Sequence, residues 1–247
     1  MLLNILSQSR VITIPDFISQ LNPLLWFKFD ESTGTTADNA GSTGATNDAT
    51  CGAGVLGNPP AYSPATYGAL FNGGSDTCTF SATNTTFTTA KSIGVCFNAI
   101  GAPSVSTSEL IYNEGDFSSS SNTGWFLAFT KSGGDISLSW LYRQDNNSLA
   151  SISAVIGEDA DYLGDHTAIA VMEGLDTGDT VYLYFDGVLV GSGDITGGVK
   201  DSASDRRIGN ATANDEFTGT MNHFFYVDRE LSASEAAYFQ ASFEAYG

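Results

Sequence analysis

The sequence predicts an all-β fold, in which two antiparallel sheets pack as a sandwich with a short C-terminal helix and an apolar N-terminal arm. The clearest observation is the pair Asp186-Gly187, which separates two apolar, strand-forming runs within residues 182–190 and predicts a hairpin with a type I′ turn. The 27 glycines of the chain agree with many short strands joined by turns. Its 247 residues are 42% hydrophobic, which is enough for one large sandwich with its own core.

The first 22 residues differ in composition from the rest of the chain and are predicted to form an arm (residues 1–22), with the sandwich domain at residues 23–247. Its charged residues are Arg10 and Asp16, and Pro15-Asp16 could open a short helix. The apolar residues of the arm include Leu2, Leu3, Ile5, Leu6, Val11, Ile12, Ile14 and Phe17. Two interpretations are open: the arm packs on its own sandwich, or it docks on neighbouring subunits, since an apolar arm left in water would be a liability.

From Pro23 onward, the chain is predicted to form successive strands separated by loops rich in glycine and polar residues. In residues 135–142, every second side chain is apolar, from Ile136 to Tyr142, and these side chains therefore share one face. Strands are expected at residues 24–29, 67–71, 77–80, 92–98, 109–113, 125–130, 135–142, 148–156, 167–173 and 218–228, in addition to the hairpin.

The C-terminal helix has a recognisable start signal. Ser232 and Glu235 stand at the spacing of a capping box, in which each side chain bonds the backbone N–H of the other residue. The apolar residues that follow at helical spacing on one face are Ala236, Phe239, Phe243 and Tyr246. A helix packed on the surface of the sandwich is therefore expected.

The chain carries a formal net charge of −19, from 28 acidic and nine basic side chains. Such a surface repels the phosphate backbone of nucleic acids and also repels anionic membranes, so neither is an expected partner. No run approaches the ~18 apolar residues of a membrane-spanning helix.

The cysteines and the N-terminus bear on the compartment of the protein. The three cysteines, Cys51, Cys78 and Cys96, do not predict a disulfide framework, although one pair could form in an oxidising setting. The N-terminus lacks the basic region and the long apolar core of a secretory signal. The sequence therefore predicts synthesis in the cytoplasm.

Four segments, in this order, resemble those of the laminin-G-like, concanavalin A-like jelly-roll domains. They are residues 25–41, residues 69–76, the hairpin at residues 182–190, and a closing part with Arg207-Ile-Gly209, Phe217-Thr-Gly219, residues 226–232 and Glu235. The resemblance covers about residues 23–245 and implies a jelly-roll sandwich. The family usually carries a tryptophan-histidine pair before the central hairpin, whereas here only His166 stands there. Because this fold hosts lectins, adhesion modules, glycosidases and virion parts, the resemblance does not decide the function.

Enzymatic activity is not expected, and no catalytic residue is predicted. Glycan hydrolysis needs a pair of carboxylates, and the resemblance implies that related glucanases carry theirs as Glu-x-Asp-x-x-Glu on one strand. That motif is absent from the sequence. The nearest acidic cluster, at residues 158–161 with Asp165, lacks the third member and lies in loop-like sequence.

Calcium is the one candidate cofactor, because it takes carboxylates and backbone oxygens from loops. The resemblance implies that some relatives bind calcium at the rims of their loops. The candidate ligands in this chain are Asp30, Asp38 and Asp76. The alternative is that these acids cap turns, a role that suits aspartate.

A sugar-binding site would combine an aromatic face with side chains that bond hydroxyl groups. The candidate residues are Tyr112, Trp125, Trp140, Tyr142 and Arg143, which fall on adjoining predicted strands. For Trp125 and Trp140 the alternative is a place in the core between the sheets, which is the commoner fate of such side chains.

The missing leader, the acidic composition, the lectin-like sandwich and the arm together predict a non-enzymatic structural or adhesion protein of a bacteriophage particle, as a head decoration or a tail-associated protein. Its partners would be other virion subunits, bound through the arm, and cell-surface glycans. It would be a homo-oligomer or part of a larger assembly, located in the virion. The alternative is a free carbohydrate-binding lectin or a glycan-active hydrolase.

Overall fold

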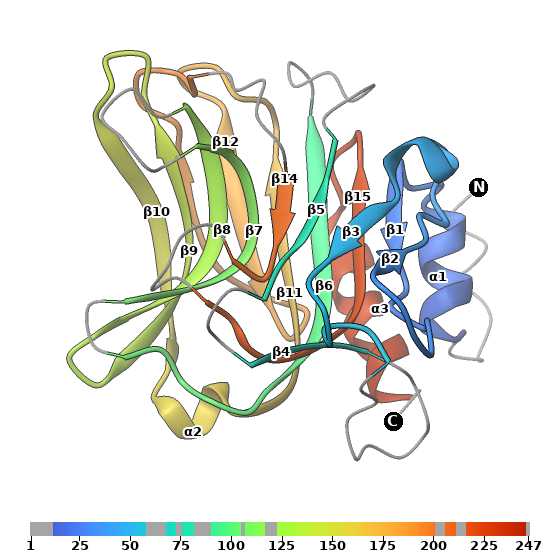
Figure 1. Ribbon diagram of the computed structural model, residues 1–247. Helices are drawn as coiled ribbons and strands as arrows, with labels where there is room; N and C mark the ends of the chain where they lie inside the picture. Colours follow the sequence, from blue (N-terminus) through green and yellow to red (C-terminus); the bar gives the residue numbers. More distant parts are fainter. Residues whose placement is uncertain are drawn as a thin grey trace.

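The computed structural model describes residues 12–57, 68–72, 76–81, 90–104, 107–116, 123–200, 206–210 and 216–245. Two antiparallel sheets pack face to face as a sandwich (Figure 1). This architecture confirms the predicted fold class. Within the described residues, no helix is long and apolar enough to cross a membrane.

Sheet A has seven strands and sheet B has eight. In sheet A, the order is β1 (Leu25–Phe27), β15 (Thr218–Val227), β6 (Lys91–Ala99), β11 (Gly164–Met172), β12 (Thr180–Phe185) and β13 (Val188–Asp194), and β4 (Ala69–Asn72) also pairs with β15. In sheet B, the order is β10 (Leu149–Gly157), β9 (Asp135–Arg143), β8 (Thr123–Ser132), β7 (Ser108–Asp116), β14 (Arg206–Ile208), β5 (Cys78–Phe80), β3 (Ala49–Cys51) and β2 (Thr36–Ala37). The helices are α1 (Ile14–Gln20), a 3-10 helix (Gly44–Asn47), α2 (Asp159–Tyr162) and α3 (Ala233–Glu244).

The predicted hairpin joins β12 to β13. Asp186 and Gly187 have φ values of 48° and 73°, as a type I′ turn requires at its two central positions. The Asp186 carboxylate also fixes the start of β11, because its Oδ1 accepts from the Thr167 backbone N–H at 3.0 Å and its Oδ2 lies 2.8 Å from His166 Nδ1. The turn is therefore locked by tertiary contacts as well as by its own backbone geometry.

Helices α1 and α3 cover the outer face of sheet A. Figure 1 shows them together beside β1 and β15, whereas α2 lies near β10 at the other side of the molecule. The ring centroid of Phe239 on α3 lies 5.2 Å from that of Phe225 on β15 and 6.0 Å from that of Phe17 on α1. Helix α3 begins at the predicted capping box, with Ser232 Oγ accepting from the Glu235 backbone N–H at 3.3 Å. The predicted C-terminal helix is confirmed.

This packing decides between the two interpretations of the arm for the residues that the structure describes. Ile14 and Phe17 are 1% and 2% exposed and belong to the apolar cluster between α1, α3 and sheet A. Ile12 is half-buried, and its backbone N–H donates to Tyr238 Oη at 3.2 Å. These three residues pack on their own sandwich, so the prediction that Ile14 and Phe17 dock on a neighbour is wrong. The other predicted assembly residues, Leu2, Leu3, Ile5, Leu6 and Val11, lie outside the described residues, as does Tyr246.

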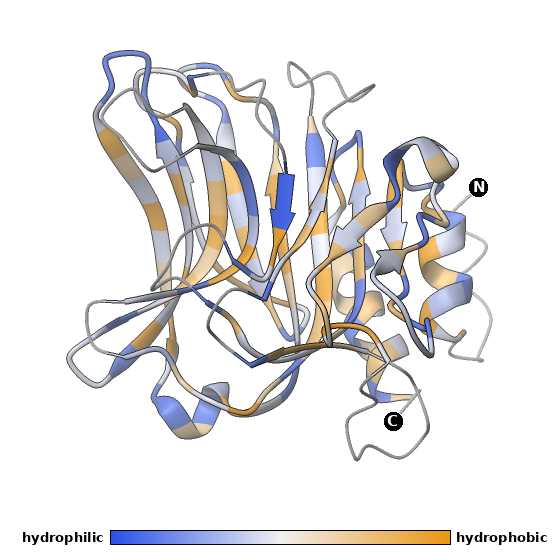
Figure 2. Ribbon diagram, in the orientation of Figure 1, coloured by the Kyte–Doolittle hydropathy of each residue, from blue (hydrophilic) through white to orange (hydrophobic). Residues whose placement is uncertain are grey.

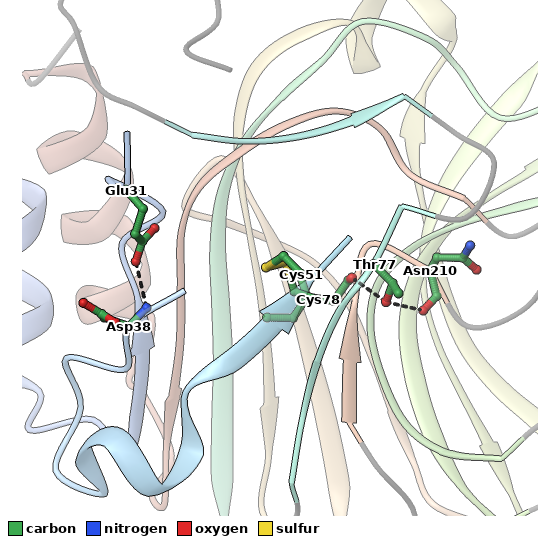
Figure 3. Close-up of a disulfide and its surroundings, with 7 residues drawn as sticks. Glu31, Asp38, Cys51, Thr77, Cys78 and Asn210 are labelled. Atoms are coloured by element: carbon green, nitrogen blue, oxygen red, sulfur yellow. Dashed lines mark hydrogen bonds between the residues drawn. A yellow bond between two sulfur atoms is a disulfide. The ribbon is translucent and has the colours of Figure 1, made fainter. Parts of the chain in front are cut away.

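Strands β3 and β5 are joined by a disulfide. Cys51 and Cys78 lie directly opposite each other in the ladder, with Cα atoms 3.9 Å apart (Figure 3). Cys96 is a buried free thiol on the other sheet. Two of the three cysteines thus form the single pair that the sequence allowed.

Replacing both Cys51 and Cys78 by alanine is expected to lower the free energy of unfolding by about 3 kcal/mol, because the bond closes a loop in the unfolded chain. The two residues are 27 positions apart. Urea unfolding of the oxidised protein and of the double variant measures the difference. Equal midpoints, with the bond shown intact by mass spectrometry, would contradict this expectation.

Candidate functional site

The outer face of sheet B is the face of the sandwich on which no described helix packs, although Leu110, Asn113 and Ala128 on it are at most 1% exposed. Helix α3 packs on β11 and β13 of sheet A and helix α1 packs on α3. In the described part of the chain, no helix lies across the outer face of sheet B: α2 packs against β9 and β10, and its Asp159 and Tyr162 contact Lys131 on β8 and Glu109 on β7. This face is therefore the candidate binding surface.

Strand pairing aligns one residue from each strand of sheet B in a straight line, which we call the cross-sheet row. Its members, in order, are Thr36, Thr50, Thr79, Arg207, Asn113, Phe126, Leu141 and Ser151. Neighbouring strands are about 4.8 Å apart, so a row across eight strands spans roughly 33 Å. One half of the row is polar and its other half contains two large apolar side chains.

Asn113 is the central polar residue of the row. Its side chain is 1% exposed, and its Nδ2 donates to the Gly115 carbonyl at 3.1 Å. Its Oδ1 is buried and accepts no hydrogen bond from any described residue. A buried acceptor without a donor costs about 1–3 kcal/mol. The row thus holds a buried acceptor that no donor among the described residues satisfies.

The neighbours of Asn113 in the row have complementary chemistry. On one side lies Arg207, whose guanidinium is a fixed set of donors, and on the other side lies the ring of Phe126. Both side chains are half-buried. Phe126 packs on Leu110 and Ala128, which form a small apolar cluster on the same face. A donor group, an acceptor and an apolar platform therefore lie side by side.

Four of the five predicted sugar-binding residues lie elsewhere. Tyr112, Trp125, Trp140 and Tyr142 are at most 1% exposed and face the interior of the sandwich. The rings of Trp125 and Trp140 are 6.0 Å apart, and the ring of Tyr142 lies 4.6 Å from that of Trp140. The prediction that these side chains contact a sugar is wrong, and the alternative of a core position is confirmed for both tryptophans.

Arg143 is the one predicted sugar-binding residue on the outer face. It is half-buried and follows Leu141 by two positions on β9, so both share that face. Its Nη1 donates to the Asn147 carbonyl at 3.1 Å. The residues that sequence reasoning missed, Asn113 and Phe126, each stand one position from a residue that it chose, on the opposite face of the same strand.

The candidate calcium ligands do not come together with other acids as a metal site. In the described ranges, no group of three histidine, cysteine or acidic residues could hold a metal ion. Asp76 Oδ2 accepts from the Asn72 backbone N–H at 2.9 Å, which is the contact of a turn cap. The Asp38 backbone N–H donates to Glu31 Oε1 at 2.7 Å (Figure 3), and Asp30 is exposed nearby. Burial, with a smaller contribution from Asp30 and Asp38, raises the pKa of Glu31.

The acidic residues near sheet B have structural partners. Glu158 and Asp161 form the capping box of α2, and Lys131 Nζ lies 2.6 Å from Asp159 Oδ1. Glu109 points inward, where Tyr162 Oη donates to its Oε2 at 2.6 Å, and burial raises the pKa of Glu109 to about 7. None of the eight members of the cross-sheet row is acidic.

Comparison with known proteins agrees with the geometry of the fold. The family model of the concanavalin A-like lectin/glucanases superfamily matches residues 72–237. No curated protein sequence matches this chain.

Solved structures with the same fold include parts of bacterial toxins. The receptor binding domain of botulinum neurotoxin D has 14% identity and a TM-score of 0.65, over 90% of this chain and 53% of that one. The type G receptor binding domain has 17% identity and a TM-score of 0.61, over 89% of this chain and 51% of that one. The serotype D ligand binding domain in complex with N-acetylneuraminic acid has 14% identity and a TM-score of 0.66, over 91% and 52%.

This chain spans about half the length of these structures, and at such low identity they show the fold alone. The family match, in contrast, covers more than half of the chain and includes the central hairpin and most of both sheets. The chain belongs to the concanavalin A-like lectin/glucanases superfamily.

Proposed function

We propose that the protein is a carbohydrate-binding module without catalytic activity, and that its ligand lies along the cross-sheet row on the outer face of sheet B. The observation that carries this proposal is the buried Oδ1 of Asn113, which accepts no hydrogen bond from the described residues and lies between Arg207 and Phe126. A sugar hydroxyl that displaces the groups covering this oxygen can donate to it and accept from a guanidinium N–H.

The apolar part of the row suits the other side of a sugar ring. Pyranose rings present C–H groups on one face, and these pack against aromatic and aliphatic side chains with release of water. Phe126 and Leu141 are adjacent in the row and both are half-buried. A ring lying across them would reach Asn113 with its hydroxyl groups.

Relatives support this class of ligand. The family is named for lectins and glucanases. Two structures with the same fold were solved with N-acetylneuraminic acid and with SialylT, both as ligands of botulinum neurotoxin domains. These are properties of those proteins, of which this chain matches about half, and they favour a carbohydrate here through the shared fold.

A binding role without catalysis is favoured by the distribution of the acids. Retaining and inverting glycosidases place two carboxylates on either side of the bond that they cleave. Among the described residues, Glu109 and Glu114 of β7 point into the interior, and the cross-sheet row holds no carboxylate. The outer face can hold a sugar but lacks such a pair along the row.

We expect Asn113→Ala and Phe126→Ala each to weaken glycan binding about tenfold or more, which corresponds to the loss of one hydrogen bond or one apolar contact. A glycan array identifies the ligand, and titration of that ligand measures the effect. Trp140→Phe is the matched control, because Trp140 is a buried aromatic residue of the same sheet. Full binding by the Asn113 and Phe126 variants together with loss in the Trp140 variant would contradict the proposed site.

The same array tests the predicted calcium requirement. The described residues offer no group of three histidine, cysteine or acidic side chains for a metal ion, so we expect binding to survive chelation. Loss of binding with EDTA, restored by added calcium, would instead favour a site at the loops of Asp30, Asp38 and Asp76. Thermal unfolding with and without EDTA provides a second readout.

A role in a bacteriophage particle is the narrower form of this proposal. It rests on the acidic composition and on the apolar residues 2–11, which lie outside the described residues. Deletion of residues 2–11 leaves α1 in place and should spare folding and glycan binding, while it should abolish incorporation into particles. Unchanged incorporation after this deletion, or absence of the protein from any particle, would contradict the role.

A further inference from the structure

The two sides of the sandwich differ in how their strand edges end. On one side, β1 and β2 are tied together, because Asn39 bridges to Phe27 and its Oδ1 accepts from the Trp26 backbone N–H at 2.9 Å. On the other side, β10 is the last strand of sheet B and β13 is the last strand of sheet A, and each pairs with a single strand in the described part of the chain. Figure 1 shows β10 at the outer edge of the sandwich.

Strand β10 lacks most of the features that protect such an edge, because its bulge lies between Val155 and Gly157, at the end of the strand. Its nine residues include no charged side chain and no proline, in a chain whose net charge is −19. Leu149 and Val155 are 52% and 61% exposed, and apolar segments recur along this strand in Figure 2. A long, uncharged edge of this kind is a template for another strand.

The sequence of β10 is symmetric by residue type about Ile152. Residues 149–155 read Leu-Ala-Ser-Ile-Ser-Ala-Val, so the two halves match in reverse order. When two copies of this strand pair in antiparallel fashion about a two-fold axis at Ile152, Leu149 lies opposite Val155, and Ser151 lies opposite Ser153. At every position, a residue then faces one of the same chemical type in the other copy. This is the self-complementarity that a two-fold interface requires.

We propose that the protein forms a two-fold dimer by antiparallel pairing of β10 with β10 of a second copy, centred on Ile152. The second copy is the favoured partner because the strand is complementary to itself. It is also favoured because two copies of charge −19 repel each other, except where they meet through an uncharged strip.

Among the described residues, β10 pairs with β9 alone, which leaves its other edge for this pairing. Strand β13 lies against the inner face of β10, where a Cβ atom at Gly191 would come within 2.6 Å of Ala154 Cβ. The outer-face side chains of Ser151 and Ser153 are exposed. The two sheets B then form one continuous sheet, with two copies of the outer face side by side.

Cross-linking tests the register directly. In the proposed dimer, residue 151 of one copy faces residue 153 of the other, with Cβ atoms about 4.5–5.5 Å apart, close to disulfide geometry. An equimolar mixture of the Ser151→Cys and Ser153→Cys proteins should therefore form a disulfide-linked heterodimer under mild oxidation. Each variant alone should not, because like positions lie about 8 Å apart on the diagonal. The native disulfide is buried and Cys96 is 0% exposed, so neither competes.

Mass measurement by light scattering tests the dimer itself. The unaltered chain should be a dimer that strengthens with added salt, as repulsion between acidic copies is screened. Ser153→Lys should give a monomer, whereas Thr36→Lys, at the opposite edge of the same sheet, should stay dimeric. Circular dichroism verifies that both variants fold.

The outcomes separate this proposal from the others. A monomeric unaltered chain at high salt and concentration, or a dimer that tolerates Ser153→Lys, would overturn it. A dimer that is lost on deletion of residues 2–11 and kept in the lysine variant would assign association to the arm and also overturn it. Glycan binding plays no part in these readouts, so the two proposals stand or fall separately.

Discussion

Replacing Arg206 by methionine is expected to lower the free energy of unfolding by about 3–5 kcal/mol. Arg206 is 0% exposed in the interior of the sandwich, and its Nε lies 3.4 Å from Glu114 Oε2. The same oxygen accepts from Tyr112 Oη at 2.9 Å, and the guanidinium lies 5.9 Å from the ring centre of Tyr226. Removal of the arginine takes away the positive charge beside the buried Glu114 carboxylate, and breaking a buried pair costs far more than the pair itself contributes.

Urea unfolding of a matched set measures this effect. Arg207→Met is the control, since Arg207 is adjacent in sequence, lies on the outer face and should lower stability less than Arg206→Met does. Adding Glu114→Gln to Arg206→Met should restore most of the loss, because the buried side chain at position 114 is then neutral as well. Equal stability of Arg206→Met and Arg207→Met would mean that the interior pair is open to water.

Local sequence signals were sufficient for the fold. The Asp186-Gly187 turn and the capping box of Ser232 and Glu235 each depend on a few adjacent residues, and the structure confirms both. The match of the family model over residues 72–237 confirms the resemblance to laminin-G-like domains, whose segments occur in the expected order along the chain. The turn and the capping box are formed by residues that are close in sequence. They can therefore be recognised from the sequence without knowledge of the tertiary structure.

The binding face was harder to predict, because it depends on which way each strand faces. The predicted sugar-binding aromatic residues lie on β7, β8 and β9. Successive side chains of a strand point to opposite faces of the sheet, and these large aromatic side chains point into the core. A register shift between Leu110 and Tyr112 adds to the difficulty. In a regular strand, residues three positions apart point to opposite faces, but this shift puts Leu110 and Asn113 on the same face. No local sequence feature predicts the shift.

The arm shows a similar dependence on tertiary structure. The apolar composition of residues 1–22 was equally compatible with docking on a neighbour and with packing on the same chain. Ile14 and Phe17 pack on their own chain because helix α3, distant in sequence, lies beside them on the outer face of sheet A, where Phe239 contacts Phe17. Contacts between segments more than 200 residues apart cannot be read from either segment alone.

Lowering the pH from 7 to 3 is expected to remove up to about 4–5 kcal/mol of stability through His223 alone. The side chain is 6% exposed on the outer face of sheet A, and its Nδ1 accepts from Trp26 Nε1 at 3.5 Å. Burial, with a smaller contribution from the neighbouring charge of Lys28, lowers the pKa of His223 to about 3. The unfolded chain binds a proton near pH 6.5 and the folded chain does so only near pH 3, so this stability is present above pH 6.5 and is lost as the pH falls.

Comparison of the unaltered chain with His223→Gln isolates this contribution, because glutamine offers Trp26 an acceptor and does not titrate. Glu109 acts in the opposite sense: its pKa of about 7 means that the folded chain holds a proton between pH 4.5 and 7, and its contribution is lost as the pH rises. Both chains should therefore carry Glu109→Gln when urea midpoints are measured from pH 3 to 8. If both lose stability equally on acidification, His223 is solvated in the folded protein, and the cover that α1 and α3 give to the Trp26 side of sheet A opens to water.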